Sequence, residues 1–163
     1  MPPRVEAYLD IETTGLSPSE HYITVVGIYA IRGTYDQLVQ LVGDEVTANN
    51  VIRALRGVDT IYTYNGSRFD LPFIQISLGV ELVRYFKHCD LMYNCWQKNL
   101  FGGLKAVERQ LRIDRKLKGV SGYDAIWLWW RYQNHNDEMA LKKLLEYNRE
   151  DLVNLKSLRD IIG

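Results

Sequence analysis

A nearly continuous apolar run from Ile23 to Ile31 places the strongest constraint on how this chain folds. The run is rich in β-branched residues, and such runs are typical of a strand that is buried on both faces. It is also too short to span a bilayer as a helix. The run therefore predicts an interior strand of a sheet, and the neighbouring segments should supply the rest of that sheet.

Alternating patterns and turn signals predict four further strands and two helices in the first half of the chain. The turn at Arg32–Gly33–Thr34 makes the third strand antiparallel to the second, as in a meander. The predicted strands cover Val5–Ile11, Ile23–Ile31, Tyr35–Val42, Thr60–Tyr64 and Val83–Cys89, and the predicted helices cover Asn49–Arg56 and Phe69–Leu78.

The remainder of the chain has helical periodicity. Leu104, Val107 and Leu111 share one face of a helix. Ser121 and Asp124 form a plausible capping box for the next helix, whose apolar face is expected to carry Tyr123, Ile126, Trp127 and Trp130, with Trp129 pointing elsewhere. The last helix begins near Met139. Strands followed by strand–helix alternation and then helices predict an α/β fold with a mixed sheet.

The length and composition fit one ordinary globular domain, which we expect to cover residues 1–163 with no domain before the first strand. Twenty basic and twenty acidic residues give zero net charge, which argues against a strongly basic nucleic-acid coat but allows a local basic groove. The N-terminus lacks a signal-peptide profile, and Cys89 and Cys95 are expected to be free thiols. The chain is therefore expected to be soluble and cytoplasmic, without a membrane partner.

Two acids stand at the end of the first predicted strand, in the stretch Asp10-Ile11-Glu12. Side chains two apart on a strand point to the same face. Carboxylates about 4 Å apart repel by roughly 4 kcal/mol at an effective dielectric near 20. A divalent cation such as Mg²⁺ or Mn²⁺ removes that repulsion. The alternative is a pair of solvated acids at a frayed strand end.

Further polar residues follow later strands. Asn65 ends the fourth strand, and Asp70 lies in the first turn of the next helix, where the helix dipole alone would favour a carboxylate. Asp90 follows the fifth strand. It is interpreted mainly as an N-cap of the helix that starts at Leu91, with a supporting role near a metal site as the alternative.

The last helix carries an acid on its apolar face. Leu144, Asn148, Asp151 and Leu155 are spaced to share one face, whereas Glu150 falls on a face expected to be solvated. Acids facing a core are rare unless they are paired or bind a metal. Tyr147 lies one turn before Asp151, so its hydroxyl group can reach the same site.

These residues together resemble the three sequence motifs of the DEDD superfamily of 3′–5′ exonucleases. The motifs are Asp10-Ile11-Glu12, then Asn65 with Phe69-Asp70, and finally Tyr147 with Asp151, and they span nearly the whole chain. Because the third motif has a tyrosine at position 147, the chain most resembles the DEDDy branch of this superfamily. The resemblance implies a ribonuclease H-like fold with a five-stranded mixed sheet flanked by helices.

The resemblance also implies hydrolysis of phosphodiester bonds with two divalent cations, Mg²⁺ or Mn²⁺, about 4 Å apart. It implies that Asp10, Glu12, Asp70 and Asp151 hold the metals, with Asp10 bridging them, and that Tyr147 positions the attacking water. Thr13 and Leu16 would contact the terminal nucleotide, with Leu16 as an apolar wedge, and Asn65 would help to hold the substrate.

Three functions remain open from the sequence. They are a 3′–5′ exonuclease acting on single-stranded DNA or RNA ends, a structure-selective nuclease of the same fold, and a non-catalytic module that binds nucleic acid or protein. The intact set of four acids and Tyr147 argues against the third. A basic cluster at Arg112, Arg115, Lys116 and Lys118 can contact phosphates or simply form a solvated loop. The zero net charge also suggests that a protein partner supplies substrate affinity.

Overall fold

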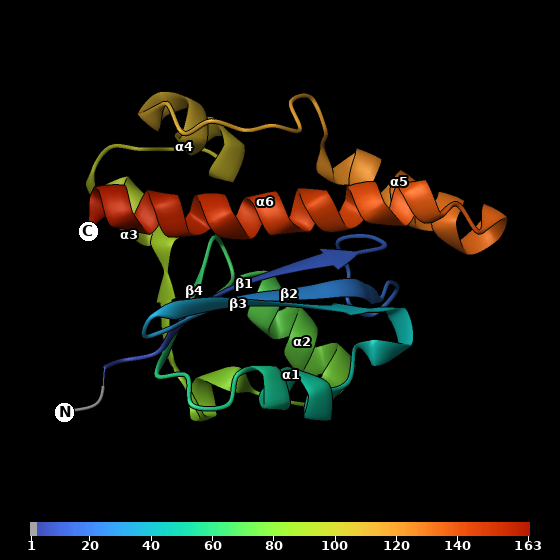
Figure 1. The fold of residues 1–163 in the computed structure, drawn as a ribbon, viewed down its shortest axis with the longest axis horizontal. Helices are drawn as coiled ribbons and strands as arrows, with labels where there is room; N and C mark the ends of the chain where they lie inside the picture. The colour runs from blue at the N-terminus through green and yellow to red at the C-terminus, as the bar shows by residue number, and fades with distance from the viewer. Residues whose placement is uncertain (1–2) are drawn as a thin grey trace.

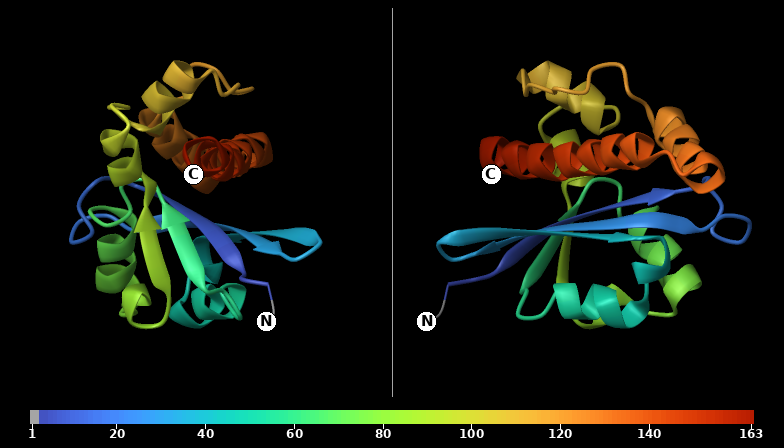
Figure 2. Two further views of the ribbon diagram at one scale, coloured as in Figure 1. Left: turned by 90° about the vertical axis from the view of Figure 1, so that its left-hand side faces the viewer. Right: turned by 45° about the vertical axis from the view of Figure 1, so that its right-hand side comes forward.

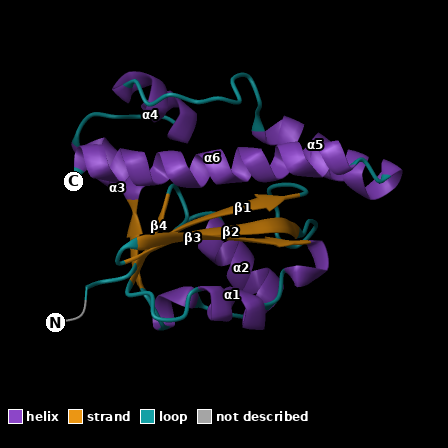
Figure 3. Cartoon of the chain, in the orientation of Figure 1, coloured by secondary structure: helices purple, strands orange, loops and turns teal. Residues whose placement is uncertain are grey.

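The computed structural model describes residues 3–163 and is built around one five-stranded mixed sheet (Figures 1 and 3). The strand order is β3-β2-β1-β4-β5. The first three strands pair antiparallel, and β4 pairs parallel with both β1 and β5. The strands are β1 (Glu6–Thr13), β2 (Ile23–Arg32), β3 (Tyr35–Val42), β4 (Thr60–Thr63) and β5 (Lys87–Asp90).

Helices cover both faces of this sheet. Figure 1 shows α1 and α2 below the sheet, and α6 running across the opposite face with α4 beyond it, an arrangement that the two views of Figure 2 also show. The helices are α1 (Ala48–Ala54), α2 (Asp70–Leu78), α3 (Leu91–Gln97), α4 (Leu104–Leu111), α5 (Gly122–His135) and α6 (Glu138–Ile162). The predicted mixed sheet flanked by helices is confirmed.

Strand β1 divides its side chains between the two helical layers. Ala7, Leu9 and Ile11 pack into the core that α1 and α2 cover. Tyr8 packs on the other side, against leucines of α6. Since side chains alternate along a strand, Asp10 and Glu12 lie on the α6 face with Tyr8. The two acids of β1 are thereby presented to the longest helix of the molecule.

Glycine at position 27 lets α6 approach the sheet closely. Gly27 pairs with Asp10 across the β1–β2 ladder. A Cβ atom at this position would lie 2.2 Å from Oδ1 of Asn148 and 2.7 Å from Cδ1 of Leu152, both on α6. Such distances are far inside van der Waals contact, so only glycine allows this separation.

Two local predictions were wrong. The predicted strand Val83–Cys89 is a short 3₁₀ turn at Leu82–Arg84 followed by the strand β5, which begins only at Lys87. The helix α5 is also rotated relative to the prediction. Trp129 is 2% exposed, whereas Trp127 is 59% exposed and Trp130 is 40% exposed.

The rotation of α5 has a physical explanation. Ala125, Leu128 and Trp129 form the buried face, and the small alanine side chain permits close packing against α6. The Trp129 indole also donates a hydrogen bond of 2.9 Å to the Tyr22 hydroxyl, which satisfies its buried polar atom. The Ser121–Asp124 capping box is present as predicted.

None of the helices over residues 3–163 has the length and apolar character that crossing a bilayer requires.

Candidate active site

Three predicted acids meet at the end of β1. Asp10 and Glu12 project from the strand, and Asp151 projects from the facing side of α6. One carboxylate oxygen from each of the three lies within 4.8 Å of the other two. Oxygen atoms that coordinate the same hard divalent cation lie this close to one another.

Asp70 approaches the same strand from the opposite layer. It begins α2, is 4% exposed, and its Oδ2 accepts a hydrogen bond of 3.0 Å from the backbone N–H of Ile11. The Asp70 carboxylate is therefore hydrogen-bonded to the backbone between Asp10 and Glu12, and it is not part of the cluster that Asp10, Glu12 and Asp151 form. The fourth predicted acid is thus beside the site, but it is oriented toward the strand.

Burial and mutual repulsion make these carboxyl groups hard to ionise. The pKa values of Asp10 and Glu12 are raised well above their ordinary range, first by burial and then by the charge of Asp151. Burial also raises the pKa of Asp151, which the nearby Arg115 partly offsets. Burial raises the pKa of Asp70 to about 7, and its bond from Ile11 opposes that shift. Within residues 3–163, neither Asp10 nor Glu12 forms an ion pair.

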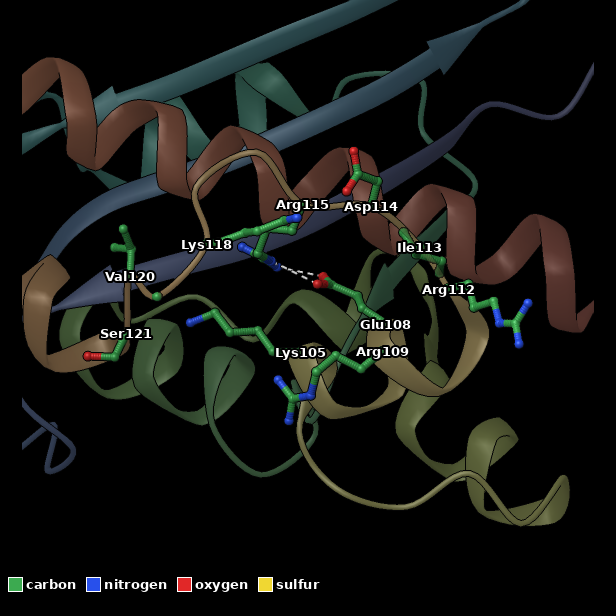
Figure 4. A pocket seen from close by; sticks show the side chains of 11 residues that line it. Lys105, Glu108, Arg109, Arg112, Ile113, Asp114, Arg115, Lys118, Val120 and Ser121 are labelled. Atoms are coloured by element: carbon green, nitrogen blue, oxygen red, sulfur yellow. Dashed lines mark hydrogen bonds and ion pairs between the residues drawn. The ribbon is translucent and has the colours of Figure 1, made fainter.

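A buried arginine holds Asp151 in place. Arg115 donates to Glu108 from Nε at 2.7 Å and from Nη2 at 2.5 Å, and Nη2 also donates to Oδ1 of Asp151 at 2.6 Å. Figure 4 shows the paired bonds between Glu108 and Arg115. The interpretation of Arg115 as part of a solvated loop is therefore wrong, because it is one of the buried charged residues of the molecule.

Glu150 also departs from its prediction. Its carboxylate accepts hydrogen bonds from the backbone N–H groups of Lys116 at 2.8 Å and Leu117 at 3.0 Å. It is therefore not on a solvated face, because the segment after α4 folds back over α6. These bonds fix the segment that carries Arg115.

Tyr147 lies where the sequence predicts. It is 5% exposed and one helical turn before Asp151. Nζ of Lys105, from α4, donates to the Tyr147 hydroxyl at 2.5 Å and lies 4.5 Å from the ring centroid. Burial and then the charge of Asp151 raise the pKa of Tyr147, so the phenol stays protonated at neutral pH.

Asn148 is a site residue to which the sequence analysis assigned no role. Its side chain is fully buried over Gly27, and Nδ2 donates to both the backbone oxygen of Asp10 at 3.2 Å and Oδ2 of Asp10 at 3.1 Å. Gln40 in turn donates to Oδ1 of Asn148 at 3.0 Å. The amide therefore connects α6 to the strand and orients the Asp10 carboxylate.

Asp90 has the capping role that the sequence analysis favoured, and it also fixes the turn after β4. It caps α3 by accepting from the backbone N–H of Met92 at 3.1 Å. It also accepts from the backbone N–H groups of Asn65 at 2.8 Å and Ser67 at 3.1 Å. These bonds hold Asn65 in the left-handed region, at φ 60°, where a residue other than glycine is uncommon.

The remaining predicted contact residues are Thr13, at the end of β1, and Leu16, in the loop that follows. The Thr13 hydroxyl donates to the backbone oxygen of Gly15 at 2.6 Å, so this side chain braces that loop. Leu16 is 82% exposed. The structure brings Asp10, Glu12 and Asp151 together with Asp70 and Tyr147 around them, and it leaves Leu16 as a free apolar side chain.

Comparisons with known proteins agree with this architecture. The family model of the RNase_H superfamily matches residues 7–162. The uncharacterized protein YprB of Bacillus subtilis is 29% identical over 167 residues, which cover 93% of this chain but only 40% of YprB.

Two solved structures are similar in fold. The family B DNA polymerase of the archaeon Pyrobaculum calidifontis superposes with a TM-score of 0.72 and 19% identity, over 99% of this chain and 25% of the polymerase. Brucella melitensis NrnC gives a TM-score of 0.61 and 18% identity, over 96% of this chain and 71% of NrnC. NrnC has also been solved with bound pGG and with bound Mg²⁺. The extent of the family match shows that this chain belongs to the RNase_H superfamily.

Proposed function

We propose that this chain is a metal-dependent 3′–5′ exonuclease of the DEDDy type that hydrolyses single-stranded nucleic acid. The observation that carries the proposal is the convergence of the Asp10, Glu12 and Asp151 oxygens within 4.8 Å. Asp70 and Tyr147 complete the motif set around them. Superfamily membership and the similar fold of a solved nuclease support the same class of chemistry.

The donor set fits two divalent cations, Mg²⁺ or Mn²⁺. Asp10, Glu12 and Asp151 offer hard oxygen ligands in a buried cluster, and burial followed by the charge of Asp151 raises the pKa values of Asp10 and Glu12. Asp70 would join them by turning its carboxylate away from the backbone of Ile11. When bound, the ions supply a hydroxide nucleophile and stabilise the charge that develops on the leaving oxygen. The Mg²⁺-bound structure of NrnC supports this assignment.

The protein's own residues position the reacting groups. The protonated Tyr147 hydroxyl, fixed by Lys105, orients the water that attacks the scissile phosphate. Asn148 and Arg115 hold the carboxylates of Asp10 and Asp151. The bond from phosphorus to the 3′ oxygen of the upstream nucleotide breaks, and a nucleoside 5′-monophosphate leaves.

Substrate contacts are proposed for Thr13, Leu16 and Asn65, with Leu16 as the wedge beside the terminal nucleotide. The exposure of Leu16 supports this role. The side-chain oxygen of Asn65 is buried without a hydrogen-bond partner within residues 3–163, which supports a contact completed by substrate. The pGG complex of NrnC supports a short nucleic acid as the kind of ligand this fold accommodates.

A cavity of about 670 Å³ whose charged lining residues are mainly basic, including the Lys105 that bonds Tyr147, is proposed to attract the phosphate backbone. Lys105 and Arg109 line it from α4, and Arg115 and Lys118 line it from the following segment (Figure 4). Neutralising phosphates is the main source of nucleic-acid affinity. This local basic lining coexists with a net charge of zero.

The protein's context is also a proposal. We propose that residues 1–163 form a single cytoplasmic domain and that a protein partner raises its substrate affinity. Tight binding of a single strand by this chain alone at physiological salt would contradict the need for such help.

The test is digestion of 5′-labelled single-stranded DNA and RNA with Mg²⁺ or Mn²⁺. Wild-type protein should shorten one of the two strands from its 3′ end and release mononucleotides. Asp151→Asn, which keeps an oxygen acceptor for Arg115, should abolish the ladder, as should a chelator. Internal fragments would favour the structure-selective nuclease, and binding without cleavage by metal-loaded protein would favour the non-catalytic module.

A further inference from the structure

A second cavity connects the carboxylates to an apolar wall. Its volume is about 480 Å³, within the range of small-ligand sites. Asp10 and Asp151 line it together with apolar residues that include Met92, Trp96 and Leu104. A ligand in this cavity can place a charged group at the carboxylate end and a flat apolar group against α3 and the start of α4.

Trp96 is the aromatic side chain of that wall. It lies near the end of α3 and is 37% exposed, although an indole is among the largest apolar groups a protein can bury. Tyr93 packs edge-on against it, with ring centroids 5.1 Å apart and an interplanar angle of 87°. This packing leaves the indole supported on one side and accessible within the cavity lining.

A cation accompanies the two rings. The guanidinium carbon of Arg68 lies 5.6 Å from the Trp96 ring centroid and 5.8 Å from the Tyr93 ring centroid. Arg68 is exposed and forms no ion pair within residues 3–163. An aromatic platform with an adjacent free cation is the combination that single-strand binding proteins use for a base and its backbone.

Hydrogen bonds fix two other residues of the cavity lining. Asn65 is held in its left-handed conformation by the bond from its backbone N–H to the Asp90 carboxylate. The Tyr64 hydroxyl donates to the backbone oxygen of Gly102 at 2.5 Å, which ties the residue after β4 to the segment before α4. This part of the lining is therefore braced by long-range contacts.

We propose that this cavity is a nucleobase subsite, in which a base next to the scissile phosphate stacks on Trp96. The proposal rests on the proposed function and adds to it the part of the substrate that is recognised. A paired base in a duplex is stacked on both faces and cannot occupy the cavity, so the substrate is an unpaired 3′ end. Stacking accepts every base because each has a π-face, so little sequence preference is expected.

The test combines Trp96 variants with abasic oligonucleotides. Binding of a fluorescent octathymidylate is measured by anisotropy with Ca²⁺ in place of Mg²⁺, alongside two versions that are abasic at the terminal or the penultimate nucleotide. Trp96→Ala should weaken binding of the intact strand at least about fivefold, the lower end of the effect of losing one stacked base. Trp96→Phe should restore most of that affinity.

The abasic strands separate stacking from a structural role. For one of the two abasic strands, wild-type protein should show the same loss of affinity that Trp96→Ala causes with the intact strand. With that abasic strand, Trp96→Ala should bind no more weakly than wild type. Trp127→Ala, an exposed tryptophan on α5, is the control and should bind like wild type.

The subsite would be overturned if Trp96→Ala weakened binding of both abasic strands as much as binding of the intact strand. It would also be overturned if Trp96→Ala bound the intact strand as tightly as wild type. No measurable binding of the intact strand by wild type would also overturn it. The binding measurement needs no cleavage. If the effect of Trp96→Ala disappears at one abasic position but the protein does not cut the strand, the subsite is supported and the exonuclease proposal is contradicted.

Discussion

Nη2 of Arg115 lies 2.6 Å from Oδ1 of Asp151, and Asp151 thereby belongs both to the acidic cluster and to a buried ion-pair network. The same nitrogen lies 2.5 Å from Oε1 of Glu108. One oxygen of Asp151 is thus held by the protein. The arginine gives that acid the partial compensation that Asp10 and Glu12 lack.

Removing the arginine should destabilise the protein strongly. Arg115→Leu leaves Glu108 buried without a cation, and breaking a buried ion pair from one side typically costs about 3–5 kcal/mol. Urea denaturation in the presence of a chelator should show a loss of this order. The control is Arg131→Leu, whose ion pair with Asp137 is much more exposed and should change the free energy of unfolding by at most about 1 kcal/mol. Equal losses for the two variants would contradict the role assigned to Arg115.

The metal-free protein should become less stable as the pH rises. Burial raises the folded-state pKa values of Asp10, Glu12 and Asp151, and it raises the pKa of the neighbouring Asp70 from an ordinary value of 3.8 to about 7. The folded state therefore holds protons that the unfolded chain has released. The stability contributed by these protonated groups is complete below about pH 4 and is lost as the pH rises through 7. Mg²⁺ should restore stability at pH 8 and do little at pH 5.5.

Neutralising one acid of the cluster should stabilise the metal-free protein at high pH. Asp10→Asn removes a repelling charge and keeps an oxygen acceptor for Asn148, so it should stabilise the metal-free protein at pH 8 by roughly 1–3 kcal/mol, equivalent to one or two pKa units. The gain should shrink at pH 5.5, where more of the acids are protonated. Denaturation curves at both pH values test this, and a destabilised variant at pH 8 would show that the cluster is not under electrostatic repulsion.

Tyr147→Phe should separate activity from folding. The substitution removes the hydroxyl that Lys105 holds and leaves the buried ring in place. If the hydroxyl orients water, the turnover number should fall by about 100-fold, the low end of the effects seen when a group that handles a reacting proton is lost. The free energy of unfolding should change by about 1 kcal/mol or less. Unchanged turnover would exclude Tyr147 from the reaction.

Gly27→Ala tests the close approach of α6. The new Cβ atom would meet side-chain atoms of Asn148 at 2.2 Å and Leu152 at 2.7 Å, so these side chains must be displaced, and we expect α6 to move away from the sheet with Asp151. We expect lower stability, by about 1–3 kcal/mol, and a higher Mg²⁺ concentration for half-maximal activity. Gly122→Ala, at a position with nothing within 4 Å, should have neither effect. Normal metal dependence in Gly27→Ala would mean that the separation of α6 from β1 is not critical.

The sequence was informative where a residue departs from a regular pattern. Asp10 and Glu12 are neighbouring acids on one face of a strand whose other face is apolar, and Asp151 lies among leucines on a helix face. The same criterion applied to α4 would have identified Glu108, which is spaced with Leu104 and Leu111 on one face and is 2% exposed.

Other features could not be read from periodicity. Arg115 lies in an irregular segment, where no pattern indicates burial, and its partners are distant in sequence. The helix α5 carries aromatic residues around much of its circumference, so its apolar stripe did not define which tryptophan is buried. The contact between Asn148 and Asp10 depends on the glycine in β2, a relationship among three elements that a single sequence does not reveal.

Calorimetric titration with Mn²⁺ at pH 8 tests most directly whether the acidic cluster is a metal centre. The wild-type protein should bind Mn²⁺, and Asp10→Asn and Asp151→Asn should each lose most of that binding while remaining folded. Asp44→Asn, which changes an exposed acid away from the cluster, should bind as wild type does. Equal Mn²⁺ binding by all four proteins, or none by wild type, would contradict the assignment of Asp10, Glu12 and Asp151 as metal ligands.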